Sequence, residues 1–429
     1  MPDQVSPPTG SERPLRVAIL SRAVHSLHGY GGLERHVEDL VRHLLARGVV
    51  VTLITRPPAR SGAGATGAPL AHPQLDCRFV PYRTFPLAGR RGTTVVDRSS
   101  AYLWFGYRAG RVAASLAAEG HIDLVHGLGA SSLGYALARR RRPVSLAPFV
   151  FNPQGLEEFG GDDGSYGGSR LKAVGYAPLR AAVRACARAA DRVLATDRAI
   201  EPMIRDRLQV PGERIRLVPN AIDLEALDRL AACADKPRIS ERLPLGPRAP
   251  VLLSVGRIEQ NKGFHVLADA LAIVGDIEWQ WVLVGDGPFR PALARRVAER
   301  GLASRVTLAG RVETSELHAW YEAATLFVHP TLYEGSSLVT LEAMGHRRAV
   351  VASAAGGLPD KVLGGVTGWL VPPGDAPGLA AALRTALADQ ERLPAMGREG
   401  RALVEREFAW PAVASRLLAV YEELRHQAG

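Results

Sequence analysis

Short apolar runs alternate with amphipathic segments along the whole chain. In the segment from Leu33 to Arg47, apolar residues recur at helical spacing, and Gly48 ends the predicted helix. Strands are expected on both sides of it and further on, at Arg16–Ser21, Val49–Thr55, Ile122–His126, Val144–Phe149, Arg192–Thr196 and Ile215–Val218. This alternation is typical of a parallel sheet with helices on both faces.

The pattern starts again after a proline-rich, charged stretch at Lys236–Pro250. Strands are expected at Val251–Val255, Trp281–Val284, Val306–Leu308, Leu326–His329 and Val350–Ala352, and a final helix at Ala412–His426. A length of 429 residues suits two cores. We therefore predict an α/β protein with two doubly wound, Rossmann-like domains facing a central cleft. The expected parts are a disordered tail (1–14), the domains 15–240 and 241–410, and a C-terminal helix (411–429) that crosses back to the first domain.

Composition narrows the class of protein. The chain is 47% hydrophobic and 22% charged, as in soluble globular proteins. No apolar run reaches the roughly 18–20 residues of a membrane-spanning helix, and residues 1–14 lack the apolar core of a secretory signal. We therefore expect a cytoplasmic protein. The wide spacing of Cys77, Cys186 and Cys233 indicates neither a disulfide framework nor a zinc site.

The net charge of +10 favours an anionic partner. No zinc-finger spacing, helix-turn-helix signature or aromatic RNA-binding consensus supports nucleic acid. Arg90, Arg91 and the run Arg139–Arg142 allow peripheral contact with an anionic membrane, although such a run is also typical of a solvated helix end. The aromatic stretch Tyr102–Phe105 either adds to membrane contact or belongs to a helix core.

Two features of the first half suggest ligand contacts. Gly31 and Gly32 lie in a glycine turn after the first strand, where backbone amides can approach a ligand and the next helix start favours an anion. The G-x-G-x-x-G spacing of a dinucleotide site is absent. His126 is expected at the end of a strand, which directs it into the cleft; the alternative is a structural histidine.

Two cations follow the first strand of the second half. Arg257 and Lys262 lie in the segment S-V-G-R-I-E-Q-N-K-G, at the strand end where open α/β sheets bind ligands. Together they can neutralise a diphosphate leaving group. The alternative is a pair of exposed surface cations.

Two glutamates follow the strand Leu326–His329. Glu334 is expected at a helix mouth, and Glu342 lies about two turns further along. The amides of Ser337 and Leu338 at the helix start can donate to phosphate oxygens. Glutamates also occur on solvated helix surfaces, so the pair alone does not distinguish a ligand site from a solvated helix.

Taken together, these segments resemble the retaining glycosyltransferases of family 4, which have the GT-B fold. The resemblance runs from about Arg16 to the C-terminal helix. Its most specific part is E-x7-E at Glu334 and Glu342. The supporting segments are Gly256–Gly263, Leu283–Pro288, Pro219–Asp223, His329-Pro330, Leu341–Met344, Val350–Ser353 and Gly356-Gly357.

The chain departs from this family pattern at two places. Ser336-Ser337 stands where Phe-Gly or Tyr-Gly is usual, and Ala221 replaces a glycine. Both departures affect the donor pocket or its hinge, so the identity of the sugar stays open.

The resemblance implies contacts with a nucleotide-diphosphate sugar. In the second half, Arg257 and Lys262 would bind the diphosphate, Glu334 the sugar hydroxyls and Glu342 the ribose, while the backbone around Arg311–Val312 would contact the base. In the first half, Gly31 and Gly32 would approach the phosphates and His126 the transferred sugar. The family implies no cofactor and no metal, in agreement with the absence of a D-x-D pair.

The implied reaction is transfer to an acceptor hydroxyl with retention of configuration. Because no nucleophile is identifiable, same-face substitution is favoured. The alternatives are an epimerase, hydrolase or phosphorylase of the same architecture, a nicotinamide-dependent oxidoreductase, and a non-catalytic membrane scaffold. The acceptor is not predictable, because the loops Pro57–Pro73 and Asn152–Ser169, where acceptor contacts are expected, match no known pattern. The donor base, the linkage and the oligomeric state are not predictable either.

Overall fold

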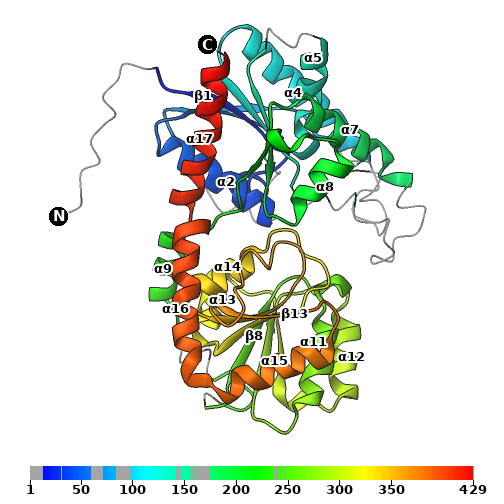
Figure 1. The fold of residues 1–429 in the computed structure, drawn as a ribbon, viewed down its shortest axis with the longest axis vertical. Helices are drawn as coiled ribbons and strands as arrows, with labels where there is room; N and C mark the ends of the chain where they lie inside the picture. The colour runs from blue at the N-terminus through cyan, green and yellow to red at the C-terminus, as the bar shows by residue number, and fades with distance from the viewer. Residues whose placement is uncertain are drawn as a thin grey trace, which may run out of the picture. The chain divides into compact units, whose positions relative to one another are not determined.

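The structure is a computed structural model. It describes residues 13–428 apart from 30, 59–70, 84–96, 98, 142–145, 155, 157–158, 160–173, 236–238, 240 and 247. The chain forms two compact units (Figure 1). The first comprises Met1–Asn152, Ala181–Asp191 and Tyr421–Gly429, and the second Pro153–Arg180 and Arg192–Val420. The expected tail lies almost wholly outside the described residues.

The first sheet has seven strands in the order β3-β2-β1-β4-β5-β6-β7. The bounds are β1 Arg16–Leu20, β2 Val50–Thr55, β3 Leu75–Phe79, β4 Leu124–Leu128, β5 Phe149–Asn152, β6 Arg192–Ala195 and β7 Ile215–Leu217. β1 pairs in parallel with β2 on one side and with β4 on the other. The strand order therefore reverses between β1 and β4, and the carboxyl ends of these strands share one edge.

Helices cover this sheet because their apolar faces need burial. Val37, Leu40, Val41 and Leu44 of α2 are buried, as the helical spacing predicts. α2 packs against β2, and α4 packs against β1 and β2. The helices up to β7 are α1 His25–His28, α2 Gly32–Leu45, α4 Ala101–Ala118, α5 Leu133–Arg141, α7 Ala177–Ala189 and α8 Ile200–Arg207.

The second sheet has six strands in the order β10-β9-β8-β11-β12-β13, and every pairing is parallel. The bounds are β8 Val251–Val255, β9 Gln280–Val284, β10 Val306–Gly310, β11 Leu326–His329, β12 Ala349–Ser353 and β13 Gly368–Val371. Alternate strand residues enter two separate cores: Leu252 and Trp281 one, Leu253 and Val282 the other. This sheet is therefore buried on both faces, which explains its continuous apolar runs.

Buried residues of the helices from α9 to α16 join the two cores of the second sheet, and α17 follows them. Their bounds are α9 Leu224–Ala232, α11 Phe264–Ile273, α12 Arg290–Glu299, α13 Thr314–Ala323, α14 Leu338–Gly345, α15 Ala376–Ala388, α16 Leu393–Leu403 and α17 Trp410–Ala428. The last residues of α17, from Tyr421 on, belong to the first unit, as expected for a helix that returns to it. Within the described residues, no helix is both long and apolar enough to cross a membrane.

Two expected strands need correction, and two further strands were not predicted. β5 begins at Phe149, where the expected strand Val144–Phe149 ends, because Pro148 has no amide to donate to a central sheet. β4 continues to Leu128, so His126 lies inside the strand and not at its end. β3 and β13 were not predicted. β3 is half exposed and mixes polar with apolar residues, and β13 is a four-residue edge strand.

Candidate active site

The loops that leave the second sheet at its carboxyl edge carry the predicted residues of this unit. Lys262 lies in the loop after β8 and Glu334 in the loop after β11. β8 and β11 are neighbours, and the strand order reverses between them. Ligands of open α/β sheets bind at such a reversal, outside the carboxyl ends of the strands. The fold therefore brings the two predicted residues to the expected place.

Glycines let these loops touch. Gly263 has φ +66°, and a Cβ there would lie 1.9 Å from the Pro330 carbonyl oxygen. A Cβ at Gly356 would lie 1.7 Å from the carbonyl oxygen of Glu334. The loops after β8, β11 and β12 thus pack backbone against backbone, which only glycine permits.

Hydrogen bonds fix the contact between the loops after β8 and β11. The Asn261 carbonyl accepts from the Leu332 amide at 2.8 Å and from the Thr331 hydroxyl at 3.2 Å. As a result, Lys262 Nζ lies 2.8 Å from Glu334 Oε2, although the two residues are 72 positions apart. The side chains are 23% and 13% exposed, so this is not a surface ion pair.

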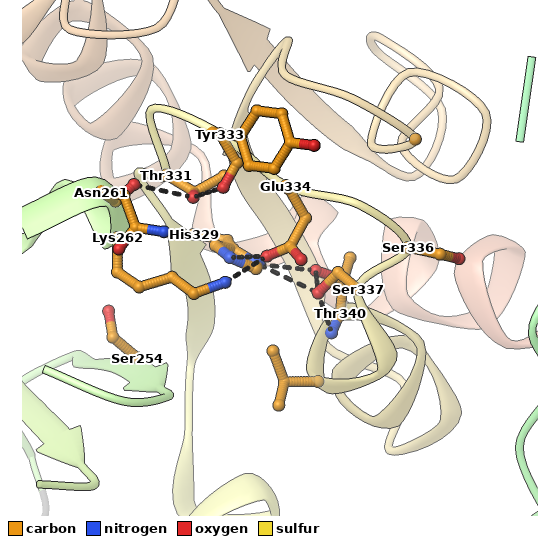
Figure 2. A network of polar contacts seen from close by, with 12 residues as sticks. Ser254, Asn261, Lys262, His329, Thr331, Tyr333, Glu334, Ser336, Ser337 and Thr340 are labelled. Carbon is orange, nitrogen blue, oxygen red and sulfur yellow. Dashed lines mark hydrogen bonds and ion pairs between the residues drawn. The ribbon is translucent and has the colours of Figure 1, made fainter. Parts of the chain in front are cut away.

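His329 contacts the same carboxylate oxygen of Glu334 as Lys262 does (Figure 2). Its Nε2 lies 3.1 Å from Glu334 Oε2, and its Nδ1 lies 2.9 Å from the Thr340 hydroxyl. The Ser337 hydroxyl contacts Thr340 Oγ1 at 2.9 Å and caps α14 by accepting from the Thr340 amide. Glu334 is therefore held by a buried network that begins on β11 and ends on α14.

This network determines the charge of Glu334. Burial alone would raise the pKa of the carboxyl group, but the hydrogen bond from His329 and the positive charge of Lys262 outweigh it. They hold the pKa of Glu334 far below its usual range. The side chain is thus a fixed carboxylate that can accept hydrogen bonds at any physiological pH.

Lys361 is a further cation that the sequence analysis missed. It is buried, and its Nζ donates to the Ser336 hydroxyl at 3.1 Å. Burial lowers the pKa of Lys361, although the negative charges of Asp197 and Glu334 oppose this. The only signal in the sequence is its place four residues after Gly357.

Glu342 lies on α14 and is 8% exposed. Tyr321 on α13 donates its hydroxyl hydrogen to Glu342 Oε2 at 2.9 Å. The interpretation of Glu334 and Glu342 as solvated helix residues is therefore wrong, because Glu342 is buried, Glu334 is partly buried, and both are hydrogen-bonded.

The other predicted residues of this unit lie around the same sheet edge. Arg257 follows β8, but its side chain is 73% exposed and pairs with Glu259 at 2.9 Å. Val312 follows β10 and packs partly against the core. Ser337 is the N-cap of α14 and Leu338 its first residue, where the amides have no helical carbonyl to donate to.

In the first unit, Gly31 and Gly32 lie at the start of α2. Gly31 is the N-cap in extended conformation, and Gly32 is the first helical residue. A Cβ at Gly31 would meet only the flexible end of the Glu34 side chain. Sterics alone therefore do not require this glycine.

His126 is buried in β4 of the first unit. Its Nδ1 lies 2.7 Å from the hydroxyl of Tyr421 on α17. Burial, together with the charge of His36, lowers the pKa of His126 to about 3, so its ring is neutral at physiological pH. Among the described residues, no group accepts or donates a hydrogen bond at Nε2.

The chain is similar to known proteins over most of its length. Residues 30–226 match the family described as Glycosyltransferase Family 4, and residues 249–389 match the one described as Glycosyl transferases group 1. It is 30% identical to D-inositol 3-phosphate glycosyltransferase 1 of Catenulispora acidiphila over 91% of this chain and 90% of that protein. This chain belongs to glycosyltransferase family 4.

Solved structures place this family 4 glycosyltransferase in the GT-B fold. Sucrose-phosphate synthase of Thermosynechococcus elongatus superposes with a TM-score of 0.69 at 27% identity, covering 96% of this chain and 99% of that one. Anabaena HepE in complex with UDP-glucose gives 0.67 at 19% identity, covering 95% and 100%. The predicted fold class and family are confirmed. The alternative of a nicotinamide-dependent oxidoreductase, which the doubly wound sheets had left open, does not agree with membership of a glycosyltransferase family.

Proposed function

We propose that this glycosyltransferase moves a sugar from a nucleotide-diphosphate sugar to an acceptor hydroxyl and retains the anomeric configuration. The observation that carries the proposal is the network of Lys262, Glu334 and His329 beside the strand-order reversal of the second sheet. The complex of HepE with UDP-glucose supports the class of donor.

In this proposal, cations of the second unit bind the donor diphosphate. Lys262 is held in place by Glu334 and keeps two further N–H groups for phosphate oxygens. Arg257, which is exposed, joins it, and the amides of Ser337 and Leu338 donate at the start of α14. Negative charge grows on the diphosphate as the glycosidic bond breaks, so these donors stabilise the transition state more than the ground state.

The carboxylates select the neutral parts of the donor. Glu334 is ionised and fixed by His329, so it accepts hydrogen bonds from sugar hydroxyls. Glu342 accepts from the ribose and is held by Tyr321. The backbone at Val312 contacts the base. The roles of Gly31, Gly32 and His126 in the first unit stay predictions of the family resemblance.

The proposed chemistry is same-face substitution. The bond between the anomeric carbon and the diphosphate oxygen breaks, and positive charge develops at the sugar. The acceptor oxygen attacks the same face, and its proton passes to the departing diphosphate. No metal is invoked, because the cationic side chains take over the neutralisation of charge.

The test is a screen of nucleotide sugars with and without acceptors, in the presence of excess EDTA. We expect acceptor-dependent sugar transfer, with a product anomer, assigned by NMR, that matches the donor. Acceptor-independent release would indicate a hydrolase, phosphate-dependent release a phosphorylase, and a changed sugar an epimerase. Activity lost in EDTA and restored by magnesium or manganese would contradict metal independence.

We also propose a cytoplasmic enzyme with weak peripheral contact to anionic membranes. Of the basic residues considered, Arg139 is paired with Asp191, whereas Arg140 and Arg141 are exposed at the end of α5. Arg90, Arg91 and Arg142 lie outside the described residues. In the aromatic stretch, Trp104 is 59% exposed and Phe105 is core. The alternative of a scaffold without catalysis predicts that Lys262 and Glu334 are replaceable without effect.

A further inference from the structure

The carboxyl edge of the first sheet carries two arginines from neighbouring strands. Arg22 follows β1 and Arg56 follows β2, and these strands pair with Leu20 opposite Ile54. The Ser21 amide continues the pairing by donating to the Ile54 carbonyl at 3.1 Å. The two side chains therefore start from adjacent points of one edge, next to the strand-order reversal between β1 and β4.

Each guanidinium lies over a tyrosine ring. Arg22 Cζ is 5.1 Å from the ring centre of Tyr102 on α4, and Arg56 Cζ is 5.8 Å from that of Tyr82 beyond β3. Tyr82 is itself fixed, since its hydroxyl donates to Asp97 Oδ2 at 2.7 Å. Stacking on an aromatic face orients a guanidinium and leaves its N–H edge available to a planar anion.

As far as the structure describes this edge, no ion pair balances the charges of Arg22 and Arg56. Burial lowers the pKa of Arg56, and the positive charge of Arg22 lowers it further. Within the described part of the chain, neither arginine forms an ion pair. Glu34 and Asp97 are the carboxylates that act on them from a greater distance.

One donor of this cluster is buried without an acceptor. Arg56 Nε has no hydrogen-bond partner among the residues described. Buried donors in folded proteins are nearly always satisfied, and an orphaned one next to a second cation indicates a missing anion.

We propose that Arg22 and Arg56 bind a phosphate ester carried by the acceptor. Two stacked guanidinium groups offer the charge and the paired N–H donors that a dianionic phosphate takes up, whereas a single carboxylate leaves one positive charge unmatched. The assignment of this phosphate to the acceptor rests on the proposed function, whereas the phosphate site itself does not. The substrate class is a phosphorylated compound with a free hydroxyl.

The test is calorimetric titration of inorganic phosphate into the full chain and its variants. Arg22→Gln and Arg56→Gln should each weaken binding roughly ten- to a hundredfold, the effect of losing hydrogen bonds to a charged group. Arg56→Lys keeps the charge but loses the forked donor, so its phosphate affinity should lie between those of the wild type and Arg56→Gln. This variant still tests the proposal if Arg56→Gln is unstable. The matched control is Arg78→Gln on β3, an exposed arginine paired with Asp76, which should bind as wild type does.

Two further titrations separate this site from the donor site. Phosphate binding that Lys262→Ala abolishes and the arginine variants retain would place the ion at the second sheet and overturn the proposal. Acetate binding as tightly as phosphate, with the same dependence on the arginines, would overturn the phosphate assignment. Arginine-dependent phosphate binding in a protein that transfers no sugar would support this site and refute the proposed function.

Discussion

The carboxyl edges of the two sheets both present cations beside a strand-order reversal, but they treat the charge differently. At the second sheet, Lys262 is matched by Glu334, which His329 holds in turn. At the first sheet, Arg22 and Arg56 stack on tyrosines and form no ion pair among the described residues. The charges at the second sheet are therefore paired without a ligand, whereas those at the first sheet are not.

This difference teaches how the same architecture can serve two kinds of ligand. A partly buried ion pair with further hydrogen bonds keeps its geometry without a ligand, so its groups are positioned before the ligand arrives. Neighbouring cations that form no ion pair repel each other until an anion binds. We therefore expect the second sheet to fix a reacting group and the first to select a charged substrate.

The largest effect is expected from breaking the ion pair. Lys262→Ala should lower turnover roughly a hundred- to a thousandfold, because one donor to the developing diphosphate charge is lost. Steady-state kinetics with the donor found by screening would measure it. The matched control is Arg384→Ala on α15, which breaks an exposed pair with Asp276 and should have no effect. Equal rates in both variants would remove Lys262 from the reaction.

The next prediction separates the two glutamates. Glu334→Gln should mainly cut the transfer rate, because misplaced sugar hydroxyls spoil the attack geometry, and should leave nucleoside diphosphate affinity intact. Glu342→Gln should weaken the nucleoside diphosphate and the nucleotide sugar in parallel. Calorimetry with both ligands decides it. Small, equal changes in the two variants would mean that these carboxylates only stabilise the fold.

A smaller effect on stability is expected in the first unit, where His126 is buried and neutral. Its pKa is about 3 in the folded chain against 6.5 as the ordinary value. Between these values the unfolded chain binds a proton that the folded one does not, so the free energy of unfolding falls as the pH drops below 6.5. At pH 5 this costs about 2 kcal/mol.

Urea unfolding at pH 7 and pH 5 tests this prediction. His126→Gln should reduce the loss of unfolding free energy between the two pH values by that amount. His121→Gln, at an exposed histidine, should behave as wild type. A loss that is unchanged in His126→Gln would show that the ring titrates in the folded protein.

The smallest effect concerns membranes. Exposed cations such as Arg140 and Arg141 should give weak sedimentation with anionic vesicles at low salt, on the order of 1 kcal/mol per suitably placed cation. Binding should disappear at high salt because the attraction is screened. Binding that ignores salt, or none at low salt, would contradict the prediction.

The sequence predicted the second sheet better than the first for a physical reason. β8 and β11 are buried on both faces, so their continuous apolar runs match the structure residue for residue. β3 is an exposed edge strand, and its polar residues interrupt the apolar pattern by which a strand is recognised in the sequence. β5 was placed too early because the apolar run around Pro148 continues across a residue that cannot join the ladder.

The site could be predicted only where a motif concentrates it. The spacing from Gly256 to Gly263 and the two glutamates indicate the right sheet edge. Lys262 and Glu334 are 72 positions apart, and their pairing depends on the adjacency of β8 and β11 in the sheet. The contact of His329 with the same carboxylate also depends on the folded loop after β11. Arg22 and Arg56 carry no motif at all, because their proximity arises from the register of β1 and β2.

The close approach at Gly356 has a consequence for engineering. Its φ is +52°, and a methyl group there would overlap the Glu334 carbonyl, so the loop after β12 acts as a template for the backbone of the E-x7-E loop. Libraries that vary Ser336 to change the choice of sugar should therefore keep Gly356 and Gly357 constant. A productive variant is expected to tolerate a larger side chain at position 336 long before it tolerates alanine at 356.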